Sequence, residues 1–78
     1  MREWMRDARK AASLTMKESC RKLGITESYY SLIENGERRK GLDPIFLSRL
    51  AVLFGLPFDD VIEMEHKYEE SVIHPHPQ

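Results

Sequence analysis

Cysteine is nearly absent from this chain of 78 residues, which contains only Cys20. A single cysteine excludes an internal disulfide framework and favours a reducing compartment, so we expect a cytoplasmic protein. No apolar run approaches the length of a membrane-spanning helix, and the opening stretch MREWMRDARK is too polar for a secretory signal. The alternation of β-branched and polar residues that predicts strands is also missing. The sequence therefore predicts a small all-α domain with no membrane segment.

Signals for catalysis and cofactor binding are equally scarce. Cys20 has no His or Asp arrangement that would activate a nucleophile, and we expect it in the core. No glycine-rich phosphate loop is present. We expect no enzyme activity, metal, cofactor or small-molecule ligand. The three histidines are more typical of adventitious metal binding than of a built site, because two of them lie in a proline-rich tail: His66, His74 and His76.

Charge is unevenly distributed, although the net charge is only −1. Residues 1–40 contain ten Lys and Arg against six Asp and Glu, a balance of +4. Residues 41–78 contain two against seven, a balance of −5. This asymmetry predicts a basic face suited to nucleic acid and an acidic remainder. Compositional scatter is the alternative interpretation.

We expect one domain of five helices over residues 1–70, followed by a flexible tail over residues 71–78. Apolar residues recur at helical spacing over residues 2–12 and predict the first helix. Thr15, with a glutamate three residues later, is a capping box that starts the second helix. That helix is expected to end at Gly24, because glycine tolerates the left-handed conformation that follows a helix end.

The second and third helices are separated by a very short turn. Only Ile25 lies between Gly24 and Thr26, which is the expected N-cap of a third helix running to about Glu34 and ending at Asn35-Gly36. Two helices joined this closely must meet at a sharp angle. The spacing indicates a helix-turn-helix unit over about residues 15–35, which presents its second helix to the DNA major groove.

Two further helices are expected in the second half. Asp43-Pro44 marks the start of the fourth, which ends at Gly55. Pro57 and the acidic pair Asp59-Asp60 mark the start of the fifth, which continues to about Glu70. Apolar residues of both helices are expected in the core: Leu47, Leu50, Ala51 and Phe54 from the fourth, and Phe58 and Val61 from the fifth.

Several short motifs accompany the helix-turn-helix spacing: Leu14-Thr15, Lys22-Leu23-Gly24-Ile25, Ser31, Ile33-Glu34-Asn35-Gly36, Leu50-Ala51 and Gly55. Together they resemble the lambda-repressor-like helix-turn-helix family of Cro and Xre regulators, over about residues 4–63. The resemblance implies a five-helix domain that binds operator DNA as a dimer, with the third helix in the major groove. It also implies an ion pair between Arg9 and Glu34.

Two positions depart from the family pattern. Met16 stands where the family often has a glutamine that contacts phosphate and the recognition helix. Ser19 replaces a usual core leucine, so we expect looser packing there unless a tyrosine fills the gap.

The outward face of the third helix carries short and nearly uncharged side chains, which suits a close approach to base edges. Glu27 is suited to accept from a cytosine amino group, Ser28 to contact several bases, and Leu32 to meet a thymine methyl group. Tyr29 is assigned to the same set, with phosphate contact and partial core packing as open alternatives. The alternative interpretation is that these four positions are ordinary solvated residues with no contact to DNA.

Basic residues follow this helix immediately and are expected to bind the DNA backbone. A solvated surface loop is the alternative. The expected phosphate-binding residues are Arg38, Arg39 and Lys40 in the loop, Thr15 and Lys17 at the start of the second helix, and Asn35 at the end of the third.

The sequence thus predicts a DNA-binding transcriptional regulator, most simply a repressor, that binds a pseudo-palindromic operator as a homodimer. One recognition helix covers only a few base pairs, and a twofold dimer would place two of them about 34 Å apart. A protein-interaction module or antitoxin subunit with the same fold is the alternative. The dimer interface is expected on the fifth helix and the start of the tail, unless the last two residues fray: Met64, Tyr68, Val72 and Ile73.

Overall fold

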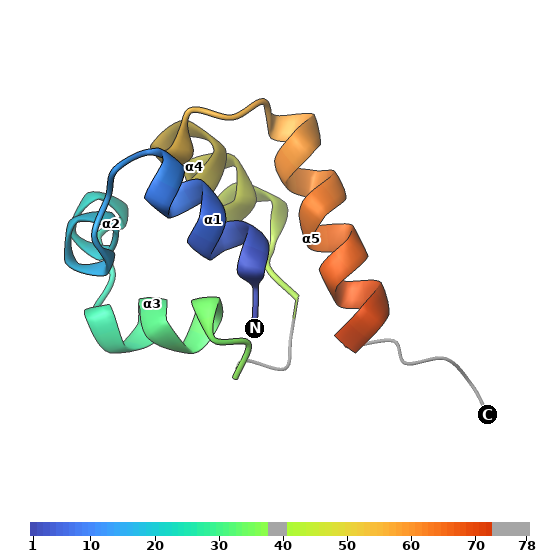
Figure 1. Ribbon diagram of the computed structural model, residues 1–78, viewed down its shortest axis with the longest axis horizontal. Helices are drawn as coiled ribbons and strands as arrows, with labels where there is room; N and C mark the ends of the chain where they lie inside the picture. Colours follow the sequence, from blue (N-terminus) through green and yellow to red (C-terminus); the bar gives the residue numbers. More distant parts are fainter. Residues whose placement is uncertain (38–40, 73–78) are drawn as a thin grey trace.

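The computed structural model describes residues 1–37 and 41–72, with only the backbone of Val72 (Figure 1). In these residues there is no strand, and the predicted all-α architecture is confirmed. None of the helices in the described ranges is long and apolar enough to cross a membrane. The five helices are α1 (Glu3–Ala11), α2 (Met16–Leu23), α3 (Glu27–Glu34), α4 (Pro44–Phe54) and α5 (Phe58–Val72).

The predicted capping residues define the boundaries of the middle helices. The side chains of Thr15, Thr26 and Asp43 each accept a hydrogen bond from the backbone N–H three residues later, at 3.0, 3.1 and 2.7 Å. Gly24 and Gly55 end α2 and α4 in the left-handed conformation, with φ of 74° and 69°. A side chain with a Cβ would be strained there, which explains why both helices end at glycine.

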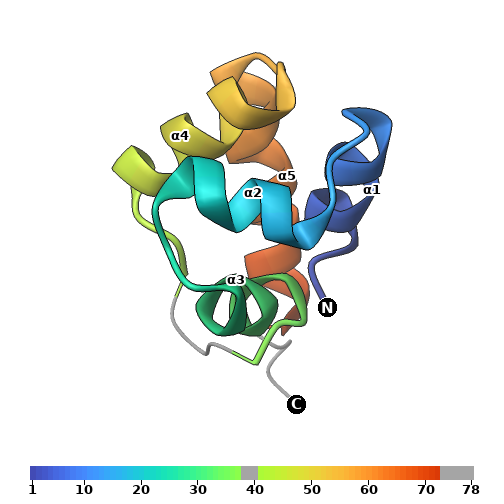
Figure 2. The ribbon, with the colours of Figure 1, turned by 90° about the vertical axis from the view of Figure 1, so that its left-hand side faces the viewer.

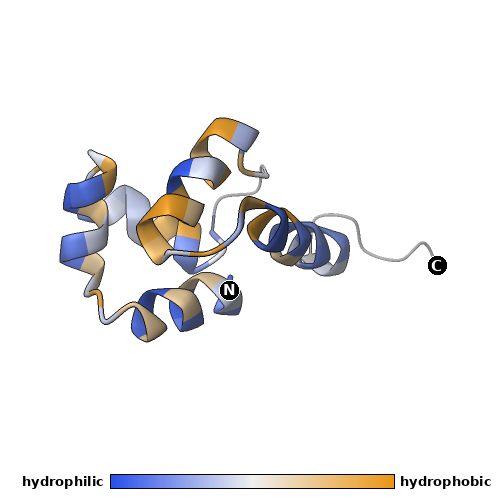
Figure 3. Ribbon diagram, turned by 90° about the horizontal axis from the view of Figure 1, so that it is seen from above, coloured by the Kyte–Doolittle hydropathy of each residue, from blue (hydrophilic) through white to orange (hydrophobic). Residues whose placement is uncertain are grey.

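Helix α4 lies at the centre of the packing and contacts α1, α2 and α5. Viewed from above, α4 is largely hydrophobic, whereas α2 is mostly hydrophilic (Figure 3). All four α4 residues predicted to face inward are buried, and Val61 of α5 is fully buried as predicted. The buried core consists of Met5, Cys20, Leu23, Tyr30, Ile33, Leu42, Leu47, Leu50, Ala51, Phe54 and Val61.

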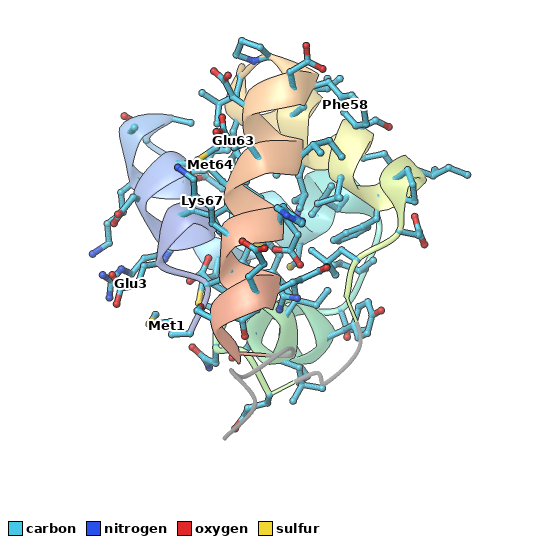
Figure 4. The ribbon with its side chains drawn as sticks, turned by 90° about the vertical axis from the view of Figure 1, so that its right-hand side faces the viewer. Met1, Glu3, Phe58, Glu63, Met64 and Lys67 are labelled. Atoms are coloured by element: carbon cyan, nitrogen blue, oxygen red, sulfur yellow. The ribbon has the colours of Figure 1, made fainter. Side chains whose placement is uncertain are left out.

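In α5, the exposure of Phe58 and the position of the helix end differ from the prediction. Phe58 was expected in the core but is 42% exposed, because it is the first residue of α5 and lies beyond the end of α4 (Figure 4). Met64 is half-buried and packs against the core. The helix also continues to Val72, slightly beyond its predicted end near Glu70.

Tyr68 is a second correction. It was expected to be exposed for a partner, but its side chain is only 9% exposed. The guanidinium carbon of Arg2 lies 4.5 Å from the centroid of the Tyr68 ring, a cation–π contact that covers it. The side chain therefore belongs to the interior of the monomer. The side chain of Val72 and all of Ile73, the other two expected interface residues of this segment, lie outside the described residues.

Arg2 forms a buried ion pair with Glu65 that joins the start of the chain to α5. Its Nη2 and Nε atoms donate to the Glu65 carboxylate at 2.8 and 2.9 Å, and the side chains of Arg2 and Glu65 are 0% and 2% exposed. The indole Nε1 of Trp4 donates to the same carboxylate at 3.1 Å. The charges are thus matched and hydrogen-bonded, which is the condition under which buried ions are tolerated.

Replacing Glu65 with Gln should lower the free energy of unfolding by roughly 3–5 kcal/mol, because the buried Arg2 guanidinium loses its counter-charge. Urea unfolding followed by Trp4 fluorescence measures the change. Glu63→Gln is the matched control: Glu63 is 67% exposed and its carboxylate lies 3.9 Å from Lys67. That change should cost less than about 1 kcal/mol. Equal effects of the two substitutions would contradict a structural role for the Arg2–Glu65 pair.

Candidate nucleic-acid interface

Helices α2 and α3 form the helix-turn-helix unit, with α2 lying across α3 (Figure 2). The turn consists of Gly24 in the left-handed conformation, Ile25, and Thr26 as the N-cap of α3. Arg49 of α4 donates a hydrogen bond to the backbone carbonyl of Leu23 at the end of α2. The turn is therefore held by the capping residues Gly24 and Thr26 and by Arg49 of α4. Helix α3 lies along one edge of the molecule (Figure 1).

Helix α3 has one buried face and one exposed face. Tyr30 and Ile33 are fully buried, and Glu34 is 2% exposed. Their spacing of three and four residues places them on the side of the helix that meets α1 and α2. The predicted base-reading residues lie on the remaining surface: Glu27, Ser28, Tyr29 and Leu32 are all exposed, as is the C-cap Asn35.

The ion pair predicted between Arg9 and Glu34 is present. Nε and Nη2 of Arg9 donate to the two carboxylate oxygens of Glu34 at 3.0 and 3.1 Å, in a bidentate arrangement. Arg9 also donates through Nη1 to the carbonyl of Leu14 at 3.1 Å. The hydrogen bond to Glu34 raises the pKa of Arg9, so its guanidinium stays charged. This pair joins α1 to the end of α3.

Arg2 holds the same end of α3 through the backbone. Its Nη1 donates to the carbonyl of Ile33 at 2.8 Å, and its backbone N–H donates to the carbonyl of Glu34 at 2.8 Å. A helix leaves its last carbonyls without intrahelical partners, and its C-terminal end attracts positive charge. Helix α3 has no basic residue in its last turn, so Arg2 supplies that charge from the start of the chain.

Sequence reasoning missed the roles of Arg2, Glu65 and Arg49. The sequence patterns used for these segments concern their apolar and capping residues, so they give no role to these three charged residues. The apolar surroundings of Glu65, with Val61 before it and Tyr68 after it at helical spacing, are the signal that was available.

Tyr30 fills the interior beside Ser19, the position where the sequence predicted a gap. Both side chains are fully buried. Burial raises the pKa of Tyr30, and the charge of Glu34 raises it further, whereas Ser19 and Arg9 lower it. The phenol therefore stays neutral, and its oxygen is buried together with the Ser19 hydroxyl.

At the start of α2, the candidate phosphate-binding groups are already partly engaged within the protein. Glu18 accepts from the Thr15 N–H at 2.9 Å while the Thr15 hydroxyl accepts from the Glu18 N–H. The hydrogen bond from the Thr15 backbone lowers the pKa of Glu18, so a negative charge stands at this helix end. Lys17 is exposed beside it and remains accessible for a phosphate.

A hollow of about 520 Å³ lies between the start of α2 and the exposed face of α3. Met16 contributes to it from α2, at the position where the resembled family often has a glutamine. Glu37 closes it beyond the end of α3, and its N–H donates to the carbonyl of Leu32 at 3.0 Å. The remaining lining residues are Glu27, Ser28, Ser31 and Leu32.

Asn35 is not among the described residues that line this hollow. Arg38, Arg39 and Lys40 lie outside the described residues. Asn35 donates through Nδ2 to the Ser31 hydroxyl at 3.0 Å. Within residues 1–37 and 41–72, no three His, Cys, Asp or Glu side chains are arranged to hold a metal ion.

Comparison with known proteins agrees with this geometry. The family model HTH_3, described as helix-turn-helix, matches residues 5–61, which span α1 through the first turn of α5. No curated protein and no solved structure matches the chain.

Replacing Arg9 with Ala should lower the free energy of unfolding by about 3 kcal/mol, because the buried Glu34 carboxylate loses its partner. Thermal or urea unfolding measures this change. Arg6→Ala is the control, since the Arg6–Asp7 pair is 3.7 Å apart and largely exposed. Its removal should change stability by less than about 1 kcal/mol. A melting temperature unchanged by Arg9→Ala would show that the pair contributes nothing to the fold.

Proposed function

The chain belongs to the HTH_3 helix-turn-helix family of DNA-binding regulators, and we propose that it is a transcriptional repressor that binds a pseudo-palindromic operator as a homodimer. The observation that carries the proposal is the exposed face of α3. Ser28 and Leu32 lie there on a helix that is capped at its start and bound by two arginines at its end. A rigid helix with short exposed side chains is what the major groove admits.

Base contacts and phosphate contacts belong to different parts of the surface. Glu27, Ser28, Tyr29 and Leu32 are assigned to bases because they lie on or beside the exposed face of α3. The phosphate contacts are assigned to positive charge and hydrogen-bond donors at the margins of α2 and α3. They comprise Lys17 and Thr15 at the start of α2, Asn35 at the end of α3, and Arg38, Arg39 and Lys40 from the following loop.

The homodimer is proposed because one α3 helix covers too few base pairs for a specific site. Tyr68 is buried and Met64 is half-buried against the core, so these two positions of α5 leave little apolar surface for a partner. Helix α4 offers a replacement: Ile45 and Val52 are 75% and 83% exposed and lie seven residues apart, on one face of the helix. We therefore assign the dimer surface to this face of α4.

Selection of bound duplexes from a random DNA pool should enrich a palindrome. Repeating the selection with protein variants distinguishes base contacts from phosphate contacts. Ser28→Ala should alter the preferred bases, at about 1–3 kcal/mol for each lost contact. The double change Arg38→Ala and Arg39→Ala removes two positive charges from each protomer, so it should weaken binding to all sequences and reduce the magnitude of the dimer's salt slope by about 4. Failure to enrich any sequence would favour the alternative, a protein-interaction module or antitoxin subunit with this fold.

Val52→Glu should convert the dimer to a monomer and weaken operator binding on the order of tenfold or more, because the interface would bury an unpaired charge. Sedimentation equilibrium measures self-association, and fluorescence anisotropy with a labelled operator measures binding. Ala11→Glu is matched in charge and lies exposed at the end of α1. It should leave self-association unchanged. A dimer of Val52→Glu as strong as the original would move the interface to another face.

A further inference from the structure

The hollow between α2 and α3 has an unusual chemical lining for a surface that meets DNA. Within residues 1–37 and 41–72, the lining supplies two carboxylates, two hydroxyls and two apolar side chains, with no basic group among them: Met16, Glu27, Ser28, Ser31, Leu32 and Glu37. Ionised carboxylates repel phosphate and only accept hydrogen bonds. If the proposed function is right, a base edge and not the backbone enters this hollow.

The lining disfavours three of the four base edges. Guanine presents two acceptors in the major groove and is typically bound by Arg or Lys, neither of which is among the lining residues in the described part of the chain. Adenine presents an amino group, but the acceptor N7 lies beside it and a carboxylate would repel N7. Thymine presents an acceptor oxygen that a carboxylate such as Glu27 would repel. Cytosine presents an amino group, the donor that a carboxylate requires.

The apolar part of the hollow adds a second requirement. Leu32 is 43% exposed at its rim, and Met16 is half-buried opposite it on α2. Ser28, one turn before Leu32, leaves room between them because its side chain is short. Contact between an exposed leucine, a thioether and a methyl group is favourable because it removes apolar surface from water. In the major groove, the available methyl group is the C5-methyl of a pyrimidine.

We infer that this hollow recognises a cytosine amino group next to a pyrimidine C5-methyl group. Glu27 accepts from the amino group, while Leu32 and Met16 cover the methyl. The two groups occur side by side on 5-methylcytosine, and also where cytosine neighbours thymine. The carboxylates add discrimination by penalising guanine and thymine oxygens at the position of the amino group. The inference rests on the proposed DNA binding and names which bases that surface accepts.

Methyl groups on synthetic duplexes test this directly with the intact chain. Starting from the sequence enriched from the random pool, each thymine is replaced by uracil and each cytosine by 5-methylcytosine, one position at a time. At one position in each half-site, losing or gaining the methyl should change the dissociation constant about fourfold. Weakening by uracil assigns the methyl to thymine, and tightening by 5-methylcytosine assigns it to a modified cytosine. Either result supports the inference.

The protein variants then show whether the hollow is responsible. Leu32→Ala should abolish the methyl-dependent difference, and Met16→Ala provides a second test from the α2 side of the hollow. Glu27→Gln should relax the preference for cytosine toward adenine, because an amide both donates and accepts. Lys17→Ala should weaken all duplexes equally and keep the methyl-dependent difference.

Three results would overturn the inference: no cytosine in the enriched half-site, no methyl effect above about twofold at any position, or a full methyl effect in Leu32→Ala. A failure to enrich any duplex would instead overturn the proposed function, and this inference with it.

Discussion

The end of α3 is the point on which the arrangement of the other helices depends. Arg9 from α1 binds the Glu34 carboxylate, and Arg2 binds the carbonyls of Ile33 and Glu34. Arg2 also reaches Glu65 on α5, so one guanidinium connects two helices that are distant in sequence. The two arginines and two glutamates neutralise one another, and the negative end of the α3 dipole adds to their attraction. Without this cluster, only the short buried side of α3 would hold it.

That short side explains why polar contacts matter so much here. Apart from Glu34, helix α3 buries only Tyr30 and Ile33. Two apolar side chains cover little area, and at about 25 cal/mol per Å² they stabilise the helix modestly. Hydrogen bonds also fix orientation more narrowly than apolar contact does, because they require particular distances and angles. If α3 presents its side chains to base edges as proposed, it needs such orientation more than it needs extra burial.

Much of this fold was predictable from short-range patterns. The caps at Thr15, Thr26 and Asp43 act within one helical turn, so sequence alone fixes where α2, α3 and α4 begin. The Arg9–Glu34 pair was accessible only through the family resemblance, since its partners lie 25 residues apart. The exposure of Ser28 and Leu32 was predictable from helical periodicity, which places them opposite Tyr30 and Ile33.

The remaining features depend on contacts that no local pattern encodes. Arg2 and Glu65 are separated by 63 residues, and a charged residue next to the chain start reads as solvated until its partner is known. Tyr68 was expected to be exposed because little chain follows it, yet the residue that covers it lies at the opposite end of the sequence. Phe58 shows the reverse case: its apolar character predicted burial, but its place at the start of α5 leaves it uncovered.

The separation of the two faces of α3 has a consequence for how such a protein changes over time. Helix α3 is held by its N-cap Thr26, by its buried side chains Tyr30 and Ile33, and by the ion pair of Glu34. Ser28 and Leu32 are exposed and belong to none of these contacts. Substitutions at these two positions are therefore nearly neutral for folding. A duplicated copy of the chain is free to drift to a new DNA target in a few steps, with the same scaffold beneath it.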